Sequence, residues 1–304
     1  MSIIYHYTSG ASLIGLISKG EFWATDINFL NDDAEHVSGY QAAVEFVQKI
    51  MQNKFEKYSR ELQNFYVELL ATISENTLGR DTYVVSFAKE KDSVAHWFSY
   101  CEKNQGYCIG FDEKEFFEDS QRLNLSKHFS SGFSDVVYAD IKEVETRLDP
   151  HLGVDAVIKV FKANEDHFAA MDRNDGGSKI LKDVCFQDTQ FKTTEEIYNS
   201  LISLASSYKV DSFKHEVERR LILSAKIGSF HEEYKKDKTG VRFRERNGII
   251  FPFIPVPFSA KSIKEIIVGP SGDFKLRKQG LGMLLAEYGV NCEITKSKTP
   301  LRFT

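Results

Sequence analysis

Two carboxylates and an arginine alternate at the start of an apolar stretch of the sequence. Glu216, Glu218 and Arg220 are each separated by one residue, and Leu-Ile-Leu-Ser follows directly. Alternate residues of a β-strand point to the same face, so a strand over 215–225 places the three side chains together. Neighbouring carboxylates can differ in pKa and in role, and an arginine can orient one of them through paired hydrogen bonds. The pattern predicts either a catalytic cleft or a surface strip of ion pairs, which contributes little to stability.

A second polar pattern closes the first expected strand, residues 3–7. His6 and Thr8 share a face, whereas Tyr7 points to the other side. An imidazole and a hydroxyl group on one face can hydrogen-bond the edge of a ribose. The alternative is a buried histidine that donates to a backbone carbonyl.

Three polar residues lie in a turn before an expected helix. Asn31 and Asp32 precede Glu35 there. Residues of these types commonly cap helices, so the turn is either structural or part of a site.

A serine interrupts an apolar strand expected over 83–88. Ser86 needs a hydrogen-bond partner if it is buried, and Phe87 follows it. The next helix, expected over 92–104 with Asp92 as its cap, carries Trp97, which is more typical of a core than of a cofactor site.

The remaining pattern predicts an α+β fold rather than a doubly wound sheet, because strands and helices do not alternate regularly. We expect one domain, residues 1–304, with a central mixed or antiparallel sheet and a helical insertion at about 34–76. Further strands are expected at 22–25, 107–112, 134–140, 247–253, 263–268 and 290–295, and further helices at 11–19, 154–170, 194–207 and 273–288.

The bulk composition limits the classes of protein. The 304 residues carry a formal net charge of −5, which is not typical of a protein that coats duplex DNA. The cysteines form no Cys-x-x-Cys pair and no zinc-ligand spacing, so we expect free thiols and no metal site. The sequence shows neither a signal-peptide pattern nor an apolar run of about 20 residues. We therefore expect a cytoplasmic protein without a membrane segment.

One basic stretch stands out in this acidic chain. Residues 234–246 read Tyr-Lys-Lys-Asp-Lys-Thr-Gly-Val-Arg-Phe-Arg-Glu-Arg. Such a run indicates either a solvated loop or edge hairpin, or a contact surface for a partner that carries phosphate groups.

Several of these segments together resemble a bacterial family of unknown function, along nearly the whole chain. The pattern starts with Tyr-His-Tyr-Thr-Ser and a Phe-Leu-Asn-Asp turn with a later glutamate. It continues with a Ser-Phe strand, a downstream tryptophan, a Gly-x-x-x-Gly-Phe strand and a Glu-x-Glu-x-Arg strand. An Ile-Ile-x-Gly-Pro strand and a Ser-Lys-x-Pro-x-Arg tail close it. Here these are Tyr5–Ser9, Phe29–Asp32 with Glu35, Ser86-Phe87, Trp97, Gly106–Phe111, Glu216–Arg220, Ile266–Pro270 and Ser297–Arg302.

The opening motif resembles the first strand of ADP-ribosyltransferases, where His-x-Thr or a similar motif holds the nicotinamide ribose. Their serine-bearing middle strand and late Glu-x-Glu strand also have counterparts. The resemblance implies a sheet of ADP-ribosyltransferase type, nicotinamide adenine dinucleotide (NAD) as substrate and no metal. It implies Glu218 and Glu216 as catalytic residues, and as cofactor-binding residues His6, Tyr7, Thr8, Asn31, Ser86, Phe87, Trp97 and Arg220. The candidates for the aromatic residue that stacks on nicotinamide are Tyr7, Phe29 and Tyr40.

The implied mechanism passes through an oxocarbenium-like state at the ribose. Glu218 would hold the 2′-hydroxyl group more tightly as charge develops. Glu216, its pKa raised by the neighbouring charge, would position or deprotonate the acceptor. His6 and Thr8 would fix a ribose, and Arg220 would orient the carboxylates or hold the pyrophosphate.

The resemblance also implies a biological setting. Some proteins of this type are phage-defence toxins that modify RNA or DNA. The implied acceptor is therefore a nucleic acid, RNA before DNA and protein, held by Lys235–Arg246, and an antitoxin protein is an implied partner.

Other interpretations stay open. With water as acceptor, the same residues would make an NAD glycohydrolase. The basic stretch also fits a nuclease or a nucleic-acid-binding effector, although no Glu-x-Lys motif lies on an expected core strand. A non-catalytic, antitoxin-like protein is the last alternative. Dependence on NAD or on metal would separate them.

Overall fold

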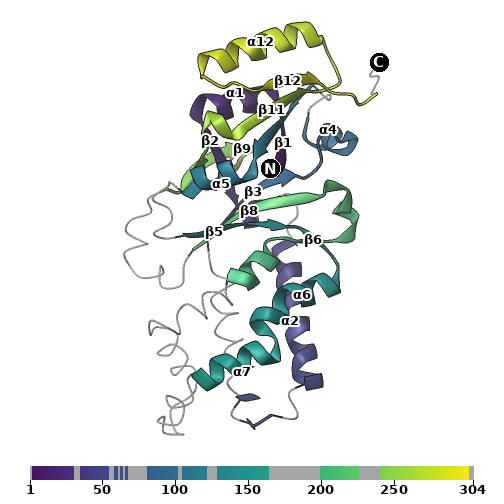
Figure 1. Ribbon diagram of the computed structural model, residues 1–304, viewed down its shortest axis with the longest axis vertical. Helices are drawn as coiled ribbons and strands as arrows, with labels where there is room; N and C mark the ends of the chain where they lie inside the picture. The colour runs from purple at the N-terminus through teal and green to yellow at the C-terminus, as the bar shows by residue number, and fades with distance from the viewer. Residues whose placement is uncertain are drawn as a thin grey trace.

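A ten-stranded, mainly antiparallel sheet forms the centre of the protein (Figure 1). The computed structural model describes residues 2–30, 35–54, 58–60, 62–63, 66–67, 81–101, 105–121, 129–163, 199–225 and 240–300. The sheet contains β1 (Ile3–Thr8), β2 (Glu21–Asp26), β3 (Thr82–Ala88), β4 (Tyr107–Asp112), β5 (Phe129–Asp135), β8 (Glu218–Ala225), β9 (Arg242–Arg246), β10 (Ile249–Pro257), β11 (Ile263–Val268) and β12 (Glu293–Lys296). The expected α+β class with a mixed, mostly antiparallel sheet is confirmed.

Helices cover both faces of this sheet. They are α1 (Gly10–Lys19), α2 (Glu35–Lys54), α4 (Val94–Tyr100), α5 (Glu113–Gln121), α6 (Ile141–Leu152), α7 (Val154–Ala163) and α12 (Phe274–Glu287). A core beneath α1, α5 and α12 includes Phe22, Phe87 and Phe111. A second core joins α2, α6 and α7 to the opposite face through Val84 and Ile222. Among the described helices, none combines the length and apolar character that a bilayer crossing needs.

The helical layer below the sheet is built from separate parts of the sequence. The helix α2, which comes from the stretch expected to be inserted at 34–76, packs against α6. A two-stranded parallel sheet, β6 (Val137–Tyr138) with β7 (Tyr208–Lys209), lies between this layer and the central sheet. The expected strand at 134–140 is thus divided between β5 and β6.

The central sheet divides along one edge of β3. On its other edge, β3 pairs with β8 from Thr82 to Ala88. On the dividing edge, β2 pairs only with its first part, through Tyr83 and Val84, and β1 joins it only at Ala88. No described strand pairs with Val85–Phe87 on that edge, so the backbone of β3 borders an opening between β1 and β2.

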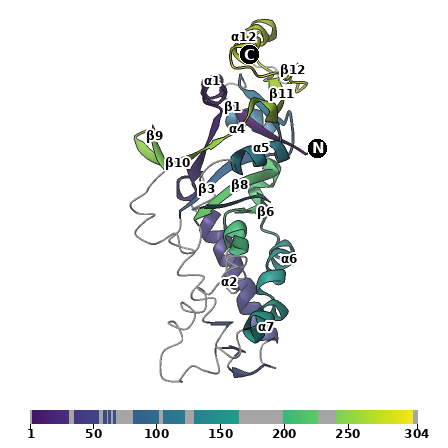
Figure 2. The same ribbon diagram turned by 60° about the vertical axis from the view of Figure 1, so that its left-hand side comes forward.

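Local sequence signals explain how the strands around this opening are held. The hydroxyl group of Ser9 accepts from the backbone N–H of Ser12 and so caps the start of α1. Gly20 ends α1 with a φ of 62°, a conformation that glycine adopts without steric cost. The turn leads directly into β2, whose outer edge pairs with β10. The hairpin of β9 and β10 then projects from the sheet beside β2 (Figure 2).

Candidate functional site

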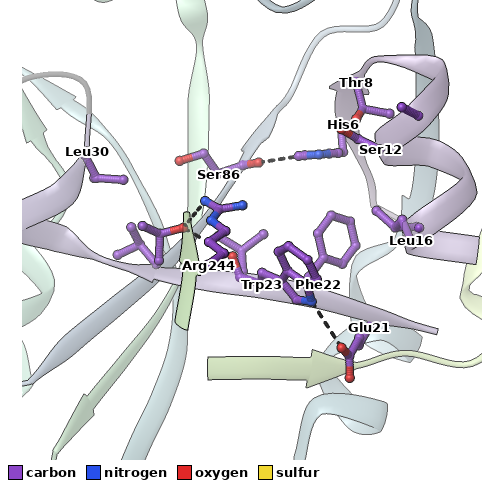
Figure 3. Close-up of a pocket in the computed structure, with 15 residues that line it drawn as sticks. His6, Thr8, Ser12, Leu16, Glu21, Phe22, Trp23, Leu30, Ser86 and Arg244 are labelled. Carbon is purple, nitrogen blue, oxygen red and sulfur yellow. Dashed lines mark hydrogen bonds between the residues drawn. The ribbon is translucent and has the colours of Figure 1, made fainter. Parts of the chain in front are cut away.

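A cleft of about 550 Å³ lies where β1 and β2 diverge along β3. Its polar lining includes His6, Thr8, Ser12, Glu21, Ser86 and Arg244. Figure 3 shows these side chains around one space, with Arg244 between Ser86 and Trp23. The volume falls within the usual range of small-molecule sites, which is roughly 300 to 1,000 Å³.

His6 fills the gap in the strand pairing of β3. Its Nδ1 lies 3.2 Å from the carbonyl oxygen of Ser86. A carbonyl oxygen only accepts hydrogen bonds, so Nδ1 carries the proton and Nε2 remains an acceptor. Burial lowers the pKa of His6 to about 4, and the imidazole is therefore neutral near pH 7. Phe22 and Phe87 pack edge-on against the ring.

Ser86 presents its backbone and its side chain to different surroundings. The carbonyl group binds His6, whereas the side chain is exposed and lies opposite Arg220 in the register of β3 and β8. Residues directly opposite each other in an antiparallel pair share a face. Ser86 therefore links the cleft to the face of the sheet that carries Arg220.

The basic stretch contributes an arginine to the same cleft. Of residues 234–246, the structure describes 240–246, and 242–246 form the edge strand β9. Arg244 donates from Nη2 to the hydroxyl oxygen of Thr25 at 2.9 Å. Its guanidinium group also lies over the rings of Trp23 and Phe251, at 5.5 and 5.8 Å from their centroids. No individual role was predicted for this arginine, although the alternation of Arg242, Arg244 and Arg246 is a strand signal.

The two glutamates belong to a buried cluster of charges on β8 and the preceding turn. Glu218 accepts from Nε of Arg220 at 2.7 Å and from Nζ of Lys209 at 2.8 Å. The same Lys209 Nζ lies 2.6 Å from Glu216. Exposed fractions are 6% for Glu218, 8% for Glu216, 6% for Lys209 and 1% for Arg220. The cluster is not a surface strip of ion pairs.

This cluster holds Glu218 in its ionised form. Burial by itself raises the pKa of Glu218, but Arg220 and Lys209 outweigh burial and lower it to about 2. Arg220 also donates to the backbone carbonyl of Ser206, so its guanidinium group faces inward. These contacts favour the carboxylate-orienting role for Arg220 over a role in holding pyrophosphate.

The expected strand over 215–225 begins later than predicted. Glu216 ends a 3-10 helix, Asp211–Glu216, and Val217 adopts a left-handed conformation with a φ of 42° before β8 begins. Glu216 therefore does not share a strand face with Glu218 by alternation. Lys209 brings their carboxylates together and places a positive charge between them. The expected environment, with two carboxylates facing each other unscreened, is thus not the one observed.

Aromatic side chains continue the cluster towards β1. The ring of His96 stacks on Tyr7 at 4.7 Å and lies 5.8 Å from Tyr100. The hydroxyl group of Tyr100 donates to Glu216 at 2.7 Å, and Tyr100 is 42% exposed. Lys209, His96 and Tyr100 were not predicted as site residues, since no local spacing marks them.

The structure separates the predicted site residues into two groups. His6, Thr8 and Ser86 border the cleft. Tyr7 lies on the other face of β1, with Trp97 edge-on to its ring, and the carboxylate cluster lies on that side. Phe87 is in the core behind His6. Tyr7 and Trp97 are therefore packing residues beside the carboxylates and do not line the cleft with His6.

Trp97 has a further role that involves the chain end. Its Nε1 donates to Asp92 Oδ1 at 2.8 Å, and Asp92 does not cap α4. The same carboxylate accepts hydrogen bonds from the hydroxyl group of Ser297, the backbone N–H of Lys298 and the hydroxyl group of Thr299. Asp92 thus explains the Ser-Lys-x-Pro pattern of the tail as a structural clamp.

Some predicted residues lie outside the described part of the protein. These are Asn31, Asp32, Arg302 and the first half of the basic stretch, 234–239. Of the candidates for the stacking aromatic residue, Phe29 packs against Phe251, with ring centroids 5.6 Å apart. Tyr40 lies on α2 and does not line the cleft.

Comparison with known proteins gives a family match over part of the chain. No curated protein and no solved structure matches the chain. Residues 96–221 match the model of a family described as "Protein of unknown function (DUF2971)". The matched segment starts in α4 and ends in β8, so it contains the charged cluster but not β1 or β9. In this segment, therefore, the chain is similar to a family for which the description gives no function.

Proposed function

We propose that the protein is an ADP-ribosyltransferase that uses NAD as its substrate. The order of the strands carries this proposal, because β1, β3 and β8 are consecutive neighbours in the sheet. They bear His6-x-Thr8, Ser86-Phe87 and Glu218, which lie far apart in the sequence. The resemblance to ADP-ribosyltransferases assigns dinucleotide binding and catalysis to these three motifs.

The cleft supplies the binding groups that a ribose needs. Neutral His6 offers Nε2 as an acceptor, and Thr8 adds a hydroxyl group on the same face of β1. Because Nδ1 is fixed by Ser86, the orientation of the ring is set before any ligand binds. In the proposed complex, the dinucleotide enters between β1 and β2 and extends across the free edge of β3.

Glu218 supplies the charge for the chemical step. Cleavage of the bond between ribose C1′ and the nicotinamide nitrogen leaves positive charge on the ribose, and nicotinamide departs with the bonding electrons. An ionised carboxylate bound to the 2′-hydroxyl group stabilises that charge. Arg220 and Lys209 keep Glu218 ionised. Glu216 and the partly exposed Tyr100 then position the acceptor, whose nucleophile forms the new bond to C1′.

The proposed acceptor is a nucleic acid, with RNA first. The described part of the basic stretch exposes Arg242, Arg246 and the ring of Phe243 on the hairpin beside the cleft. Arginines bind phosphates and exposed aromatic rings stack on bases, which suits a single strand. We place this activity in the bacterial cytoplasm, as a toxin of antiviral defence restrained by an antitoxin protein.

The proposal is tested with NAD labelled in its adenylate part. Purified protein is incubated with RNA, single-stranded DNA and a protein extract, and free nicotinamide and label on each acceptor are measured. The wild type should release nicotinamide and label the RNA, whereas Glu218→Gln should lower both at least 100-fold. Glu113→Gln is the matched control, because Glu113 binds Arg219, the neighbouring arginine of β8, at 2.5 Å, and it does not line the cleft.

The outcomes separate the interpretations. Nicotinamide release without label on any acceptor indicates a glycohydrolase. Absence of release with every acceptor refutes the proposal. Full activity of a folded Glu218→Gln variant refutes the role of Glu218. Ser86→Ala is a second variant for the same assay. It shortens the exposed side chain of Ser86 but keeps the backbone carbonyl group that holds His6.

A further inference from the structure

Arg244 carries a positive charge in the cleft that no described carboxylate neutralises. None of the ion pairs between described residues includes it. One hydrogen bond, from Nη2 to Thr25, is formed, and Nε is buried without any partner. The side chain is half-buried, and burial together with nearby Arg246 lowers the pKa of Arg244.

Other arginines of the described residues that are withdrawn from water have partners that compensate their charge. Arg219 pairs with Glu113 and Asp135, and Arg220 pairs with Glu218. Arg277 lacks a carboxylate but donates to several backbone carbonyls, those of Gln105, Gly106, Gly269 and Ser271. Arg244 has neither arrangement. A cation withdrawn from water without compensation costs stability, so its retention in a cleft indicates a ligand that supplies the missing charge.

The surroundings of Arg244 are positive overall. Glu21 is the one carboxylate among the residues that line the cleft. It accepts from the indole Nε1 of Trp23 at 3.1 Å and pairs with Arg242 at 3.4 Å. Lys19 also lies over the Trp23 ring, with its Nζ 4.5 Å from the ring centroid. One acid therefore faces several cations, and the excess charge favours an anion.

The geometry of Arg244 suits a phosphate group. The rings of Trp23 and Phe251 hold the guanidinium group, and the bond to Thr25 fixes one end of it. A planar guanidinium with free donors binds a phosphate through two parallel hydrogen bonds. Because the guanidinium group of Arg244 is already held in place, less side-chain entropy is lost when it binds a phosphate.

We infer that Arg244 forms an anion subsite of the cleft that takes the diphosphate of a nucleotide. The inference rests on the proposed function, in which that group is the pyrophosphate of NAD. It assigns the hairpin of β9 and β10 a second role, because β9, whose Arg242 and Arg246 are exposed, also carries the Arg244 that lines the cleft. The ribose would then lie towards His6 and the diphosphate towards Trp23.

Binding measurements by calorimetry test the subsite without relying on turnover. The probes are ADP-ribose, ADP, inorganic pyrophosphate and adenosine. The variants are Arg244→Ala, Arg244→Lys and Lys275→Ala, the last being the control because Lys275 is an exposed cation on α12 that does not line the cleft. Thermal unfolding of each variant shows whether it is folded. Arg244→Ala should not be less stable than the wild type, since the charge that it removes is unpaired.

The wild type should bind ADP-ribose and ADP, and Arg244→Ala should weaken both at least tenfold. Arg244→Lys should restore only part of the loss, and Lys275→Ala should change affinity less than twofold. Binding of pyrophosphate alone, lost in Arg244→Ala, shows that the anion suffices; binding of ADP but not pyrophosphate shows that the nucleoside is required. Equal affinities of the wild type and Arg244→Ala, or no binding of any phosphate probe, overturn the inference.

Failure here differs from failure of the proposed function. If ADP-ribose binds through Arg244 but NAD is never cleaved, the subsite stands and the transferase proposal falls. If NAD is cleaved with the same KM in the wild type and in Arg244→Ala, the transferase stands and the subsite falls.

Discussion

Replacing Glu218 with glutamine should show how strongly the buried charge cluster stabilises the fold. Glutamine keeps the shape of the side chain but removes the negative charge that Arg220 and Lys209 contact. Arg220 is 1% exposed, so water cannot take the place of that charge. The variant therefore buries the Arg220 guanidinium group without the carboxylate that neutralises it, which is costly.

The magnitude follows from the pKa of Glu218. Burial opposes ionisation, but Arg220 and Lys209 lower the pKa from an ordinary 4.5 to about 2. A gap of about 2.5 units at about 1.4 kcal/mol per unit gives about 3 to 4 kcal/mol of stability. Because the pKa of the folded state is the lower one, this contribution is complete above pH 4.5 and is lost as the pH falls towards 2. Lys209 still has Glu216 in the variant, which limits the loss.

Urea unfolding at pH 7 and pH 4 provides the assay. At pH 7, Glu218→Gln should lower the free energy of unfolding by about 3 kcal/mol without changing the slope against urea. At pH 4 the difference from the wild type should shrink by about 1 kcal/mol, because the wild type has lost that part of its advantage. Glu113→Gln should cost about 1 kcal/mol or less, since that carboxylate is partly exposed and Arg219 retains Asp135. A loss below about 1 kcal/mol at pH 7 for Glu218→Gln would refute the reasoning.

Two other predictions test single contacts. Burial lowers the pKa of His6 to about 4. The wild type should therefore lose at most about 3 kcal/mol of stability as the pH falls from 6.5 to 4, whereas His6→Gln should not show this loss. Parallel curves of unfolding free energy against pH for the two proteins would contradict this prediction. Asp92→Ala removes the acceptor of Trp97 and of the tail segment 297–299. Trypsin should then cut at Lys298 at least tenfold faster, with Asp273→Ala, which removes the cap of α12, as control; equal cleavage of both variants would show that the clamp does not hold the tail.

Elements with local signals could be predicted from the sequence. The serine cap, the apolar face and the terminal glycine of helix α1 all lie within residues 9–20. The apolar strands β3, β4 and β11 also lie close to their expected ranges. In these segments the periodicity and the turn residues indicate the same structure that the packing requires, so tertiary contacts do not override them.

The start of β8 could not be predicted in this way. Strict alternation of Glu216, Glu218 and Arg220 fits a strand, yet Val217 takes a left-handed conformation, which β-branched residues seldom adopt. Long-range contacts hold it there: the carbonyl group of Val217 accepts from Lys89, and Glu216 is bound by Lys209 and Tyr100. The sequence contains each of these partners but nothing that indicates they meet.

The two faces of the sheet raise the same difficulty for the site. Alternation shows that His6 and Tyr7 point to opposite sides of β1, but only the register shows which side Glu218 shares. Tyr5 lies opposite Ala88, and Ala88 lies opposite Glu218, so Glu218 is on the side of Tyr5 and Tyr7. Register depends on how the strands pair across the whole sheet, and spacing within one strand does not determine it.

The divergence of β1 and β2 offers a physical way for one ligand to use both faces. In a continuous sheet, the backbone of β3 and its two neighbours would separate His6 from Glu218. Here the edge of β3 at Val85–Phe87 is unpaired by described strands, and His6 reaches the carbonyl group of Ser86 through that gap. The side chain of Ser86 lies exposed on the side of Glu218, one strand away, and adjacent strands are only about 5 Å apart. A site that needs both motifs therefore depends on β2 being held away from β1, by the turn at Gly20 and by the pairing of β2 with β10.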